Sequence, residues 1–328
     1  MDVHEFVKKF SDLYVVDAIY KANREIELHD DILCSISGGS DSDIMLDLLS
    51  ELGANYKTTY VWFDTGLEYD ATKRHLKELE NKYNVHIVPL KAKKPIPIVC
   101  NTYGQPFLSK QVSENIARLQ KHNFKWEDKP FEELYKEYPK CKVALRWWCN
   151  DWGEGSRFNI SYNTWLKEFM IENPPTFKTS NKCCSFAKKN VAKDYIANGS
   201  FDLNCVGVRK SEGGARAGAY KNCFTPSENG EIDQYRPIFW FDDASKQHYK
   251  EIQKIQNSDC YEVWGLKRTG CAACPFGRNY EYELKCIEQY EPKFYKAVNK
   301  IFGKSYEYTR KYREFQKRMK SDKNATLS

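Results

Sequence analysis

The sequence lacks the long apolar runs that a membrane-spanning helix needs. No uninterrupted hydrophobic stretch approaches the roughly 18 residues required, and the first five residues show no basic region followed by an apolar one. The six histidines form no metal-ligand motif, and the chain has no internal repeats. These absences exclude a transmembrane bundle and argue against a secretory signal, so we expect a cytoplasmic protein with no membrane partner.

Cysteines and basic residues are the features that stand out. The 328 residues include 12 cysteines, which in a cytosolic chain predict metal or redox chemistry more often than disulfides. Much of the net charge of +6 lies in the basic stretch 304–323. Tyr306, Tyr308, Tyr312 and Phe315 alternate with its cations. This tail is either a solvated amphipathic helix or a nucleic-acid surface, in which cations meet phosphates and rings stack on bases.

Short apolar runs alternate with helical spacing along the first 90 residues. Strands are predicted at 31–36, 58–63 and 85–90, after a first helix at 5–28 and with helices at 44–52 and 71–83 between them. This order predicts an α/β fold with a doubly wound, mostly parallel sheet. Further strands are predicted at 201–208 and 235–241, a helix at 244–255 and helix beyond 277. We expect a nucleotide-binding domain at 1–242 with a helical insertion at about 95–175, and a helical region at 243–328.

A glycine-rich turn separates the first strand from its helix. Its residues are Ser37, Gly38, Gly39, Ser40, Asp41 and Ser42. The N–H groups and partial positive charge of a helix N-terminus suit an anion, and the glycines let the backbone approach it closely. The serine hydroxyls add donors, while Asp41 is a candidate helix cap or Mg²⁺ ligand. The turn lacks the Lys of a Walker A motif.

The turn resembles the pyrophosphate loop (PP-loop) of the adenine-nucleotide α-hydrolase superfamily. Asp64, Thr65 and Gly66 resemble the second-strand motif of its PAPS reductase family, where this turn lies near the nucleotide. The segments 103–110 and 206–216 resemble two further blocks of that family. The resemblance implies an adenine nucleotide, ATP or the sulfonucleotides APS or PAPS, as ligand. It implies three cations as nucleotide contacts: Lys110, Arg209 and Arg216. Asp41, Arg209 and Arg216 are the candidate catalytic residues.

Four cysteines form the first candidate metal set. Two thiolates of a Cys-x-x-Cys turn converge on one centre, and a metal needs two more ligands. Spacing alone permits two sets, one of Cys183, Cys184, Cys271 and Cys274, the other of Cys260, Cys271, Cys274 and Cys286. The resemblance favours the first, since APS-type reductases hold a 4Fe–4S cluster with a Cys-Cys pair and a distant Cys-x-x-Cys. Zinc is the alternative metal.

Three functions follow as expectations. The first is an ATP pyrophosphatase that adenylates an acceptor for sulfur transfer, with Mg²⁺ and a sulfur-donor protein. The second is a PAPS or APS reductase using a thioredoxin-like reductant; the Glu-Cys-Gly-x-His motif of the assimilatory enzymes occurs nowhere in the chain, which favours the first function. The third is a non-enzymatic, metal-containing module that binds nucleic acid through the basic tail.

Overall fold

The computed structural model describes residues 2–213, 218–228 and 232–325. The chain divides into two compact units, each built from two segments. Unit 1 comprises 1–93 and 188–272, and unit 2 comprises 94–187 and 273–328. The expected boundary at 242/243 therefore falls inside unit 1, and the whole of the expected helical insertion at about 95–175 falls in unit 2. No helix among the described residues is both long and apolar enough to cross a bilayer.

A six-stranded sheet forms the centre of unit 1 in the described residues, with strand order β3-β2-β1-β4-β6-β5. Its strands are β1 (Ile32–Ser35), β2 (Thr58–Asp64), β3 (Ile87–Lys91), β4 (Leu203–Cys205), β5 (Phe224–Thr225) and β6 (Asp233–Tyr235). All neighbours pair in parallel except β5 with β6. The predicted α/β fold with a mostly parallel sheet is confirmed. The predicted strand 235–241 is wrong beyond residue 235, because residues 236–241 form turns that close on one another through backbone hydrogen bonds.

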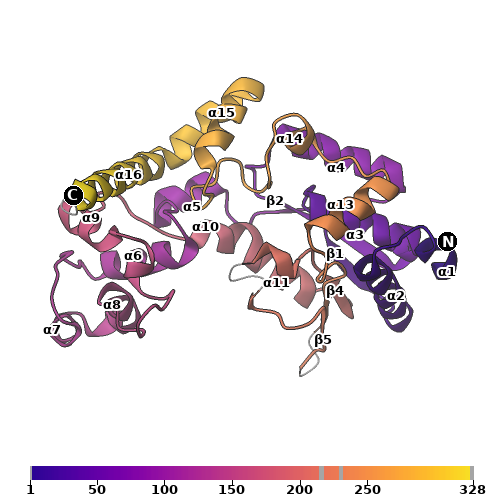
Figure 1. The fold of residues 1–328 in the computed structure, drawn as a ribbon, viewed down its shortest axis with the longest axis horizontal. Helices are drawn as coiled ribbons and strands as arrows, with labels where there is room; N and C mark the ends of the chain where they lie inside the picture. The colour runs from indigo at the N-terminus through magenta and orange to yellow at the C-terminus, as the bar shows by residue number, and fades with distance from the viewer. Residues whose placement is uncertain (1, 214–217, 229–231, 326–328) are drawn as a thin grey trace. The chain divides into compact units, whose positions relative to one another are not determined.

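Several helices of unit 1 contribute apolar residues to a core that they share with the strands. The helices of the unit are α1 (Val3–Val7), α2 (Leu13–Leu28), α3 (Ser40–Glu51), α4 (Asp70–Tyr83), α11 (Asn190–Ala197), α13 (Asp243–Ile252) and α14 (Asp259–Glu262), with 3₁₀ turns η1 (Ala54–Lys57) and η5 (Lys210–Glu212). The expected helix at 5–28 is two helices, because the side chain of Asp12 caps a new one by accepting the amides of Tyr14 and Val15. Figure 1 shows α3 following β1 directly.

Unit 2 is helical. Its elements are α5 (Ile96–Tyr103), α6 (Lys110–Lys121), α7 (Phe131–Glu137), η2 (Pro139–Cys141), α8 (Lys142–Trp148), η3 (Ile160–Tyr162), α9 (Leu166–Glu172), α10 (Lys182–Cys184), α15 (Tyr280–Tyr290) and α16 (Pro292–Ala325), while the π-helical turn η4 (Ser185–Lys189) spans the change of unit. Gly104 has φ +119°, and a Cβ there would lie 2.4 Å from the Lys178 carbonyl oxygen. The glycine is therefore required by the close approach of two backbones.

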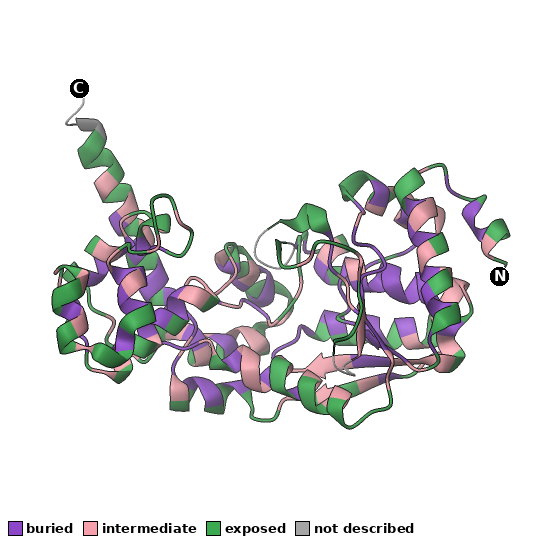
Figure 2. Ribbon diagram, turned by 90° about the horizontal axis from the view of Figure 1, so that it is seen from below, coloured by how far each residue is buried: buried purple, intermediate pink, exposed green. Residues whose placement is uncertain are grey.

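The tail helix α16 packs its aromatic side chains into the core of unit 2. Tyr306, Tyr308, Tyr312 and Phe315 are each no more than 7% exposed, and three of them join the cluster around Phe169 and Trp148. Arg310 and Arg313 pair with Glu281, and Arg318 pairs with Glu172. The turns after Phe315 are mostly exposed (Figure 2). These rings are core residues and are not free to stack on bases.

A buried carboxylate joins three helices of unit 1. Asp47 of α3 is 2% exposed and accepts hydrogen bonds from Tyr83 (2.9 Å), Tyr249 (2.8 Å) and Gln253 (2.9 Å). Tyr249→Phe removes one donor and leaves two, so we expect the free energy of unfolding to fall by about 1–2 kcal/mol. Chemical denaturation measures this, with the 85% exposed Tyr56 changed to Phe as a control that leaves stability unaltered. Equal stability of both variants would contradict the assigned network.

Candidate functional site

The Ser42 side chain holds the PP-loop in its conformation through hydrogen bonds with the loop backbone. The Ser42 hydroxyl oxygen accepts the amides of Ser37 (3.2 Å) and Gly39 (3.1 Å), and its hydrogen is donated to the Gly39 carbonyl (2.8 Å). Ser42 is 5% exposed. Its hydroxyl therefore shapes the loop, whereas the sequence alone suggested a donor to the ligand. Gly38 has φ +65°, and a Cβ there would lie 2.9 Å from the Thr72 methyl group, which explains the glycine at this position.

Three strand ends bring the predicted segments to one edge of the sheet. β2, β1 and β4 are neighbours and parallel, so the residues that follow them meet at the carboxyl edge, where α/β sheets bind ligands. The loop follows β1, the Asp64–Gly66 turn ends β2, and Arg209 follows β4. A Cβ on Gly207 would lie 3.7 Å from the Asp41 backbone, so the β4 segment runs close beside the start of α3.

Two cations converge on the first turn of α3. The Asp41 carboxylate lies 3.1 Å from Arg209 Nε and 2.7 Å from Lys246 Nζ. Burial alone would raise the pKa of Asp41, but a hydrogen bond with Glu212 and the charges of Lys246 and Arg209 lower it. Arg209 is 7% exposed and also bonds Asp243 and Ser211. Lys246 could not be recognised from the sequence, because it belongs to no motif and lies on an ordinary amphipathic helix.

This pairing bears on the expected Mg²⁺ ligand. One Asp41 oxygen is held by both cations, and Asp41 belongs to no group of three or more His, Cys, Asp or Glu side chains in the described ranges that could hold a metal ion. The Mg²⁺ role of Asp41 stays a prediction. Arg209 and Lys246 instead offset the charge of the Asp41 carboxylate at this end of α3. Lys110 belongs to unit 2, where its carbonyl accepts from Asn181. Arg216 lies outside the described residues.

The Asp64–Gly66 turn is held by a buried carboxylate. Glu68, 4% exposed, accepts from the Thr65 hydroxyl (2.6 Å) and the Thr65 amide (3.0 Å), and burial raises the pKa of Glu68. Asp64 accepts the Gly66 amide at 3.0 Å. Thr65 Oγ1 lies 3.5 Å from Cys271 Sγ. The Cys-x-x-Cys segment therefore begins beside the predicted nucleotide turn, within unit 1.

Four cysteines of unit 2 influence one another. Cys183 hydrogen-bonds both Cys100 and Cys184, and the bond with Cys100 is the largest cause of its raised pKa, with Cys274 contributing through its charge. Cys100, on α5, was not a candidate in the sequence because it belongs to no paired motif. In the alternative set, Cys260 contacts Thr72 at 3.7 Å and Cys286 hydrogen-bonds Tyr282.

The thiols fit a thiolate-bound metal in donor type. In geometry, no group of three or more His, Cys, Asp or Glu side chains in the described ranges is placed to hold a metal ion.

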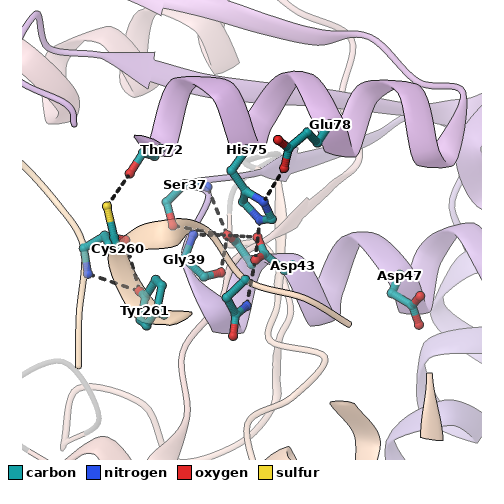
Figure 3. Close-up of polar contacts among 12 residues, drawn as sticks. Ser37, Gly39, Asp43, Asp47, Thr72, His75, Glu78, Cys260 and Tyr261 are labelled. Atoms are coloured by element: carbon teal, nitrogen blue, oxygen red, sulfur yellow. Dashed lines mark hydrogen bonds and ion pairs between the residues drawn. The ribbon is translucent and has the colours of Figure 1, made fainter. Parts of the chain in front are cut away.

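A buried ion pair joins α4 to the helix that follows the loop, α3 (Figure 3). His75 Nε2 lies 2.9 Å from Asp43 Oδ2, and the same oxygen accepts from Asn257 at 3.0 Å. His75 is 4% exposed and Asp43 is fully buried. Burial alone would lower the pKa of His75, but the hydrogen bond and charge of Asp43, with a contribution from Glu78, raise it. The protonated ring therefore ties α4 to the first turn of α3.

The raised pKa predicts a pH-dependent stability. Stabilisation by protonated His75 is complete below its unfolded-state pKa of about 6.5 and is lost as pH rises through the folded-state value. We expect His75→Gln to lower the free energy of unfolding by about 2 kcal/mol at pH 6 and by less at pH 9. Denaturation at both pH values checks this, with the exposed His86 changed to Gln as control. A larger loss at pH 9 would contradict it.

A comparison with known protein families finds a match over part of the chain. Residues 31–157 match the family model of the phosphoadenosine phosphosulfate (PAPS) reductase domain. This part of the chain is similar to a PAPS reductase domain, the family that the sequence resembles. The domain match includes the PP-loop and the Asp64–Gly66 turn. No curated protein matches the chain.

Solved structures resemble the chain only distantly. PAPS reductase from Candida auris in a phosphate complex is 12% identical with a TM-score of 0.43, over 82% of this chain and 93% of that one. FMN adenylyltransferase from Candida glabrata with FAD and pyrophosphate is 11% identical with a TM-score of 0.39, over 84% and 76%. The U34-tRNA thiolase NcsA from Methanococcus maripaludis, with its [4Fe-4S] cluster, is 11% identical with a TM-score of 0.36, over 90% and 79%. These values say nothing about the substrate of this chain.

Proposed function

We propose that unit 1 binds the phosphates of an adenine nucleotide at the PP-loop and that the chain is an ATP pyrophosphatase that adenylates an acceptor. The convergence of Arg209 and Lys246 on the N-terminal turn of α3 is the observation that carries this proposal. Two cations, the helix dipole and a glycine-rich backbone together favour a polyanion. ATP brings its Mg²⁺ with it as part of the substrate.

In the proposed reaction, the residues around the loop stabilise negative charge on the phosphates. A nucleophilic atom of the acceptor attacks the α-phosphorus of ATP, the bond to the bridging oxygen breaks, and pyrophosphate leaves. The leaving pyrophosphate gains negative charge, which the α3 amides, Arg209 and Lys246 offset. One preorganised donor of this kind contributes about 10²–10³ in rate. We expect the adenylated acceptor then to receive sulfur from a donor protein.

The domain match favours a second candidate, a sulfonucleotide reductase. It would release sulfite from PAPS or APS at the expense of a thioredoxin-like reductant. The full chain, purified anaerobically, is incubated with ATP, APS or PAPS, and the ATP reaction is repeated with bulk RNA and with DNA as acceptors. Pyrophosphate from ATP supports the first function. Sulfite without pyrophosphate supports the second function. If neither product forms, both functions are contradicted.

For the metal we retain Cys183, Cys184, Cys271 and Cys274 as the proposed ligands of a 4Fe–4S cluster, with zinc as the alternative. Support comes from the interaction of Cys183 with Cys184 and Cys274 and from the short spacing of Cys271 and Cys274. When bound, such a cluster supplies electrons or a sulfur-binding iron.

A further inference from the structure

One cavity of unit 1 is separate from the PP-loop. Its volume is about 440 Å³, which lies within the range of small-molecule sites. A face of α2 forms one part of its lining, and residues of β5 and β6 form another. None of the described residues in the lining belongs to the PP-loop, to the Asp64–Gly66 turn or to the pair of Arg209 and Lys246. The cavity is therefore not part of the proposed nucleotide site.

Two charged side chains of the lining already have partners. Lys21 Nζ lies 2.7 Å from the carboxylate of Asp17. The Asp233 carboxylate lies 3.2 Å from His29 Nε2 with one oxygen, and with the other it accepts the Ser227 amide at 2.6 Å. Lys21 and Asp233 are therefore matched within the chain itself.

Arg24 and Glu25 are the two charges of the lining that remain, one of each sign. Glu25 is 9% exposed, and the partner of its carboxylate among the described residues is His29 Nδ1 at 3.9 Å, beyond hydrogen-bond distance. That ring nitrogen donates instead to the Glu25 carbonyl oxygen at 2.7 Å. Arg24 is exposed and forms no ion pair within the described part of the chain. Adjacent residues of a helix do not face each other, so these two charges do not neutralise one another.

The lining also contains a buried hydroxyl group without a partner. Tyr235 is 2% exposed, and its hydroxyl forms no hydrogen bond with any described residue. Buried polar groups are normally satisfied, so such an exception is expected to meet a polar group from outside the chain. Phe224, which pairs with Tyr235 between β5 and β6, and Leu28, 63% exposed, add apolar surface to the same lining.

We propose that this cavity binds a small zwitterion, namely an α-amino acid with an apolar side chain. The ammonium group pairs with Glu25 and donates to the Tyr235 oxygen, while the ligand carboxylate pairs with Arg24. The ligand side chain contacts Leu28 and Phe224. A ligand with only a positive charge would leave Arg24 unmatched, and one with only a negative charge would leave the buried Glu25 carboxylate unmatched. The proposal does not depend on the proposed function, because it uses no residue of the nucleotide site.

Titration calorimetry of the full chain tests the site with L-leucine, L-methionine and L-phenylalanine as probes. We expect at least one of the three to bind. Two analogues of that amino acid then separate its charges: the amine that lacks the carboxylate and the acid that lacks the ammonium group. For leucine these are 3-methylbutylamine and 4-methylpentanoate. Each analogue is expected to bind about tenfold more weakly or worse, because it loses one charge-assisted contact.

Glu25→Gln assigns the binding to this cavity. The variant keeps the shape of the side chain and removes its charge, so we expect the same amino acid to bind about tenfold more weakly or worse. Glu27→Gln, at an exposed position of the same helix, is the matched control and leaves the dissociation constant unchanged.

Tyr235→Phe gives a second, independent measurement. The lost hydroxyl has no partner in the ligand-free chain, so we expect an unaltered unfolding midpoint without ligand and binding about threefold to tenfold weaker. A lower midpoint with unchanged binding would show a structural hydroxyl and contradict its place in the site.

Binding of an amino acid that weakens in both analogues and in Glu25→Gln supports the zwitterion site. An analogue that binds as tightly as its parent amino acid overturns the proposal, and so do equal losses in Glu25→Gln and Glu27→Gln. Failure of all three amino acids to bind also overturns it. Pyrophosphate release from ATP is measured separately, so the proposed function stands or falls on its own.

Discussion

Gly39→Val is expected to reduce pyrophosphate release from ATP at least 100-fold, the loss of a preorganised oxyanion contact. A Cβ at this position would lie 3.1 Å from the Tyr261 phenol oxygen, 3.2 Å from Ser37 Oγ and 3.3 Å from Thr269 Oγ1. Valine adds two methyl groups beyond that Cβ, directed at the same polar atoms. The phosphates and these methyl groups would require the same space.

The backbone conformation at Gly39 is one that valine also adopts, so the substitution does not strain the backbone. Gly39 has φ −104° and ψ 153°, a conformation that valine adopts readily, so the chain is expected to fold. The control is Gly303→Val, where a Cβ would meet nothing within 4 Å in the long tail helix. Pyrophosphate release is followed with a coupled assay. Full activity in Gly39→Val, or equal losses in both variants, would count against the loop as the nucleotide site.

Cys183→Ser is expected to remove most of the iron and the broad visible absorbance of the anaerobically purified chain. Cys183 is the thiol that connects Cys100, Cys184 and Cys274, so its loss leaves any shared metal short of a central ligand. Serine keeps the size of the side chain and offers a hard oxygen in place of a soft thiolate. Iron, sulfide and zinc are quantified together, so that a zinc site is recognised as such.

Cys286→Ser is the matched comparison, because Cys286 belongs to the alternative set and hydrogen-bonds Tyr282 within its own helix. We expect this variant to keep its metal. Colour and iron that survive in Cys183→Ser but vanish in Cys286→Ser would transfer the proposed site to the alternative set. If the wild-type chain contains neither iron nor zinc, the proposal of a resident metal is contradicted for both sets.

The sheet could be predicted because its signals are local. The apolar run at 31–36, the glycine turn and the helical spacing after it lie within about 20 residues, and they specify β1, the PP-loop and α3 in order. The run at 235–241 misled, because its apolar residues Ile238, Phe239 and Phe241 are buried by turns. An apolar run predicts that its residues are buried, but it does not predict the backbone conformation in which they are buried.

The composition of the site was harder to predict, because its contacts join distant parts of the chain. Lys246 reaches Asp41 across more than 200 residues, and Asn257 reaches Asp43 in the same way. Neither residue carries a motif. The tail left two interpretations open, since rings alternating with cations match a stacking surface and also match a buried helix face, and Tyr308 and Phe315 prove to be core. Only packing distinguishes the two.

A crystal structure of the full chain with a non-hydrolysable ATP analogue tests the central claim most directly. We predict density for the β- and γ-phosphates at the Gly38–Ser42 turn, within reach of Arg209 and Lys246. Phosphates bound elsewhere on the chain, with that turn unchanged, would contradict the account.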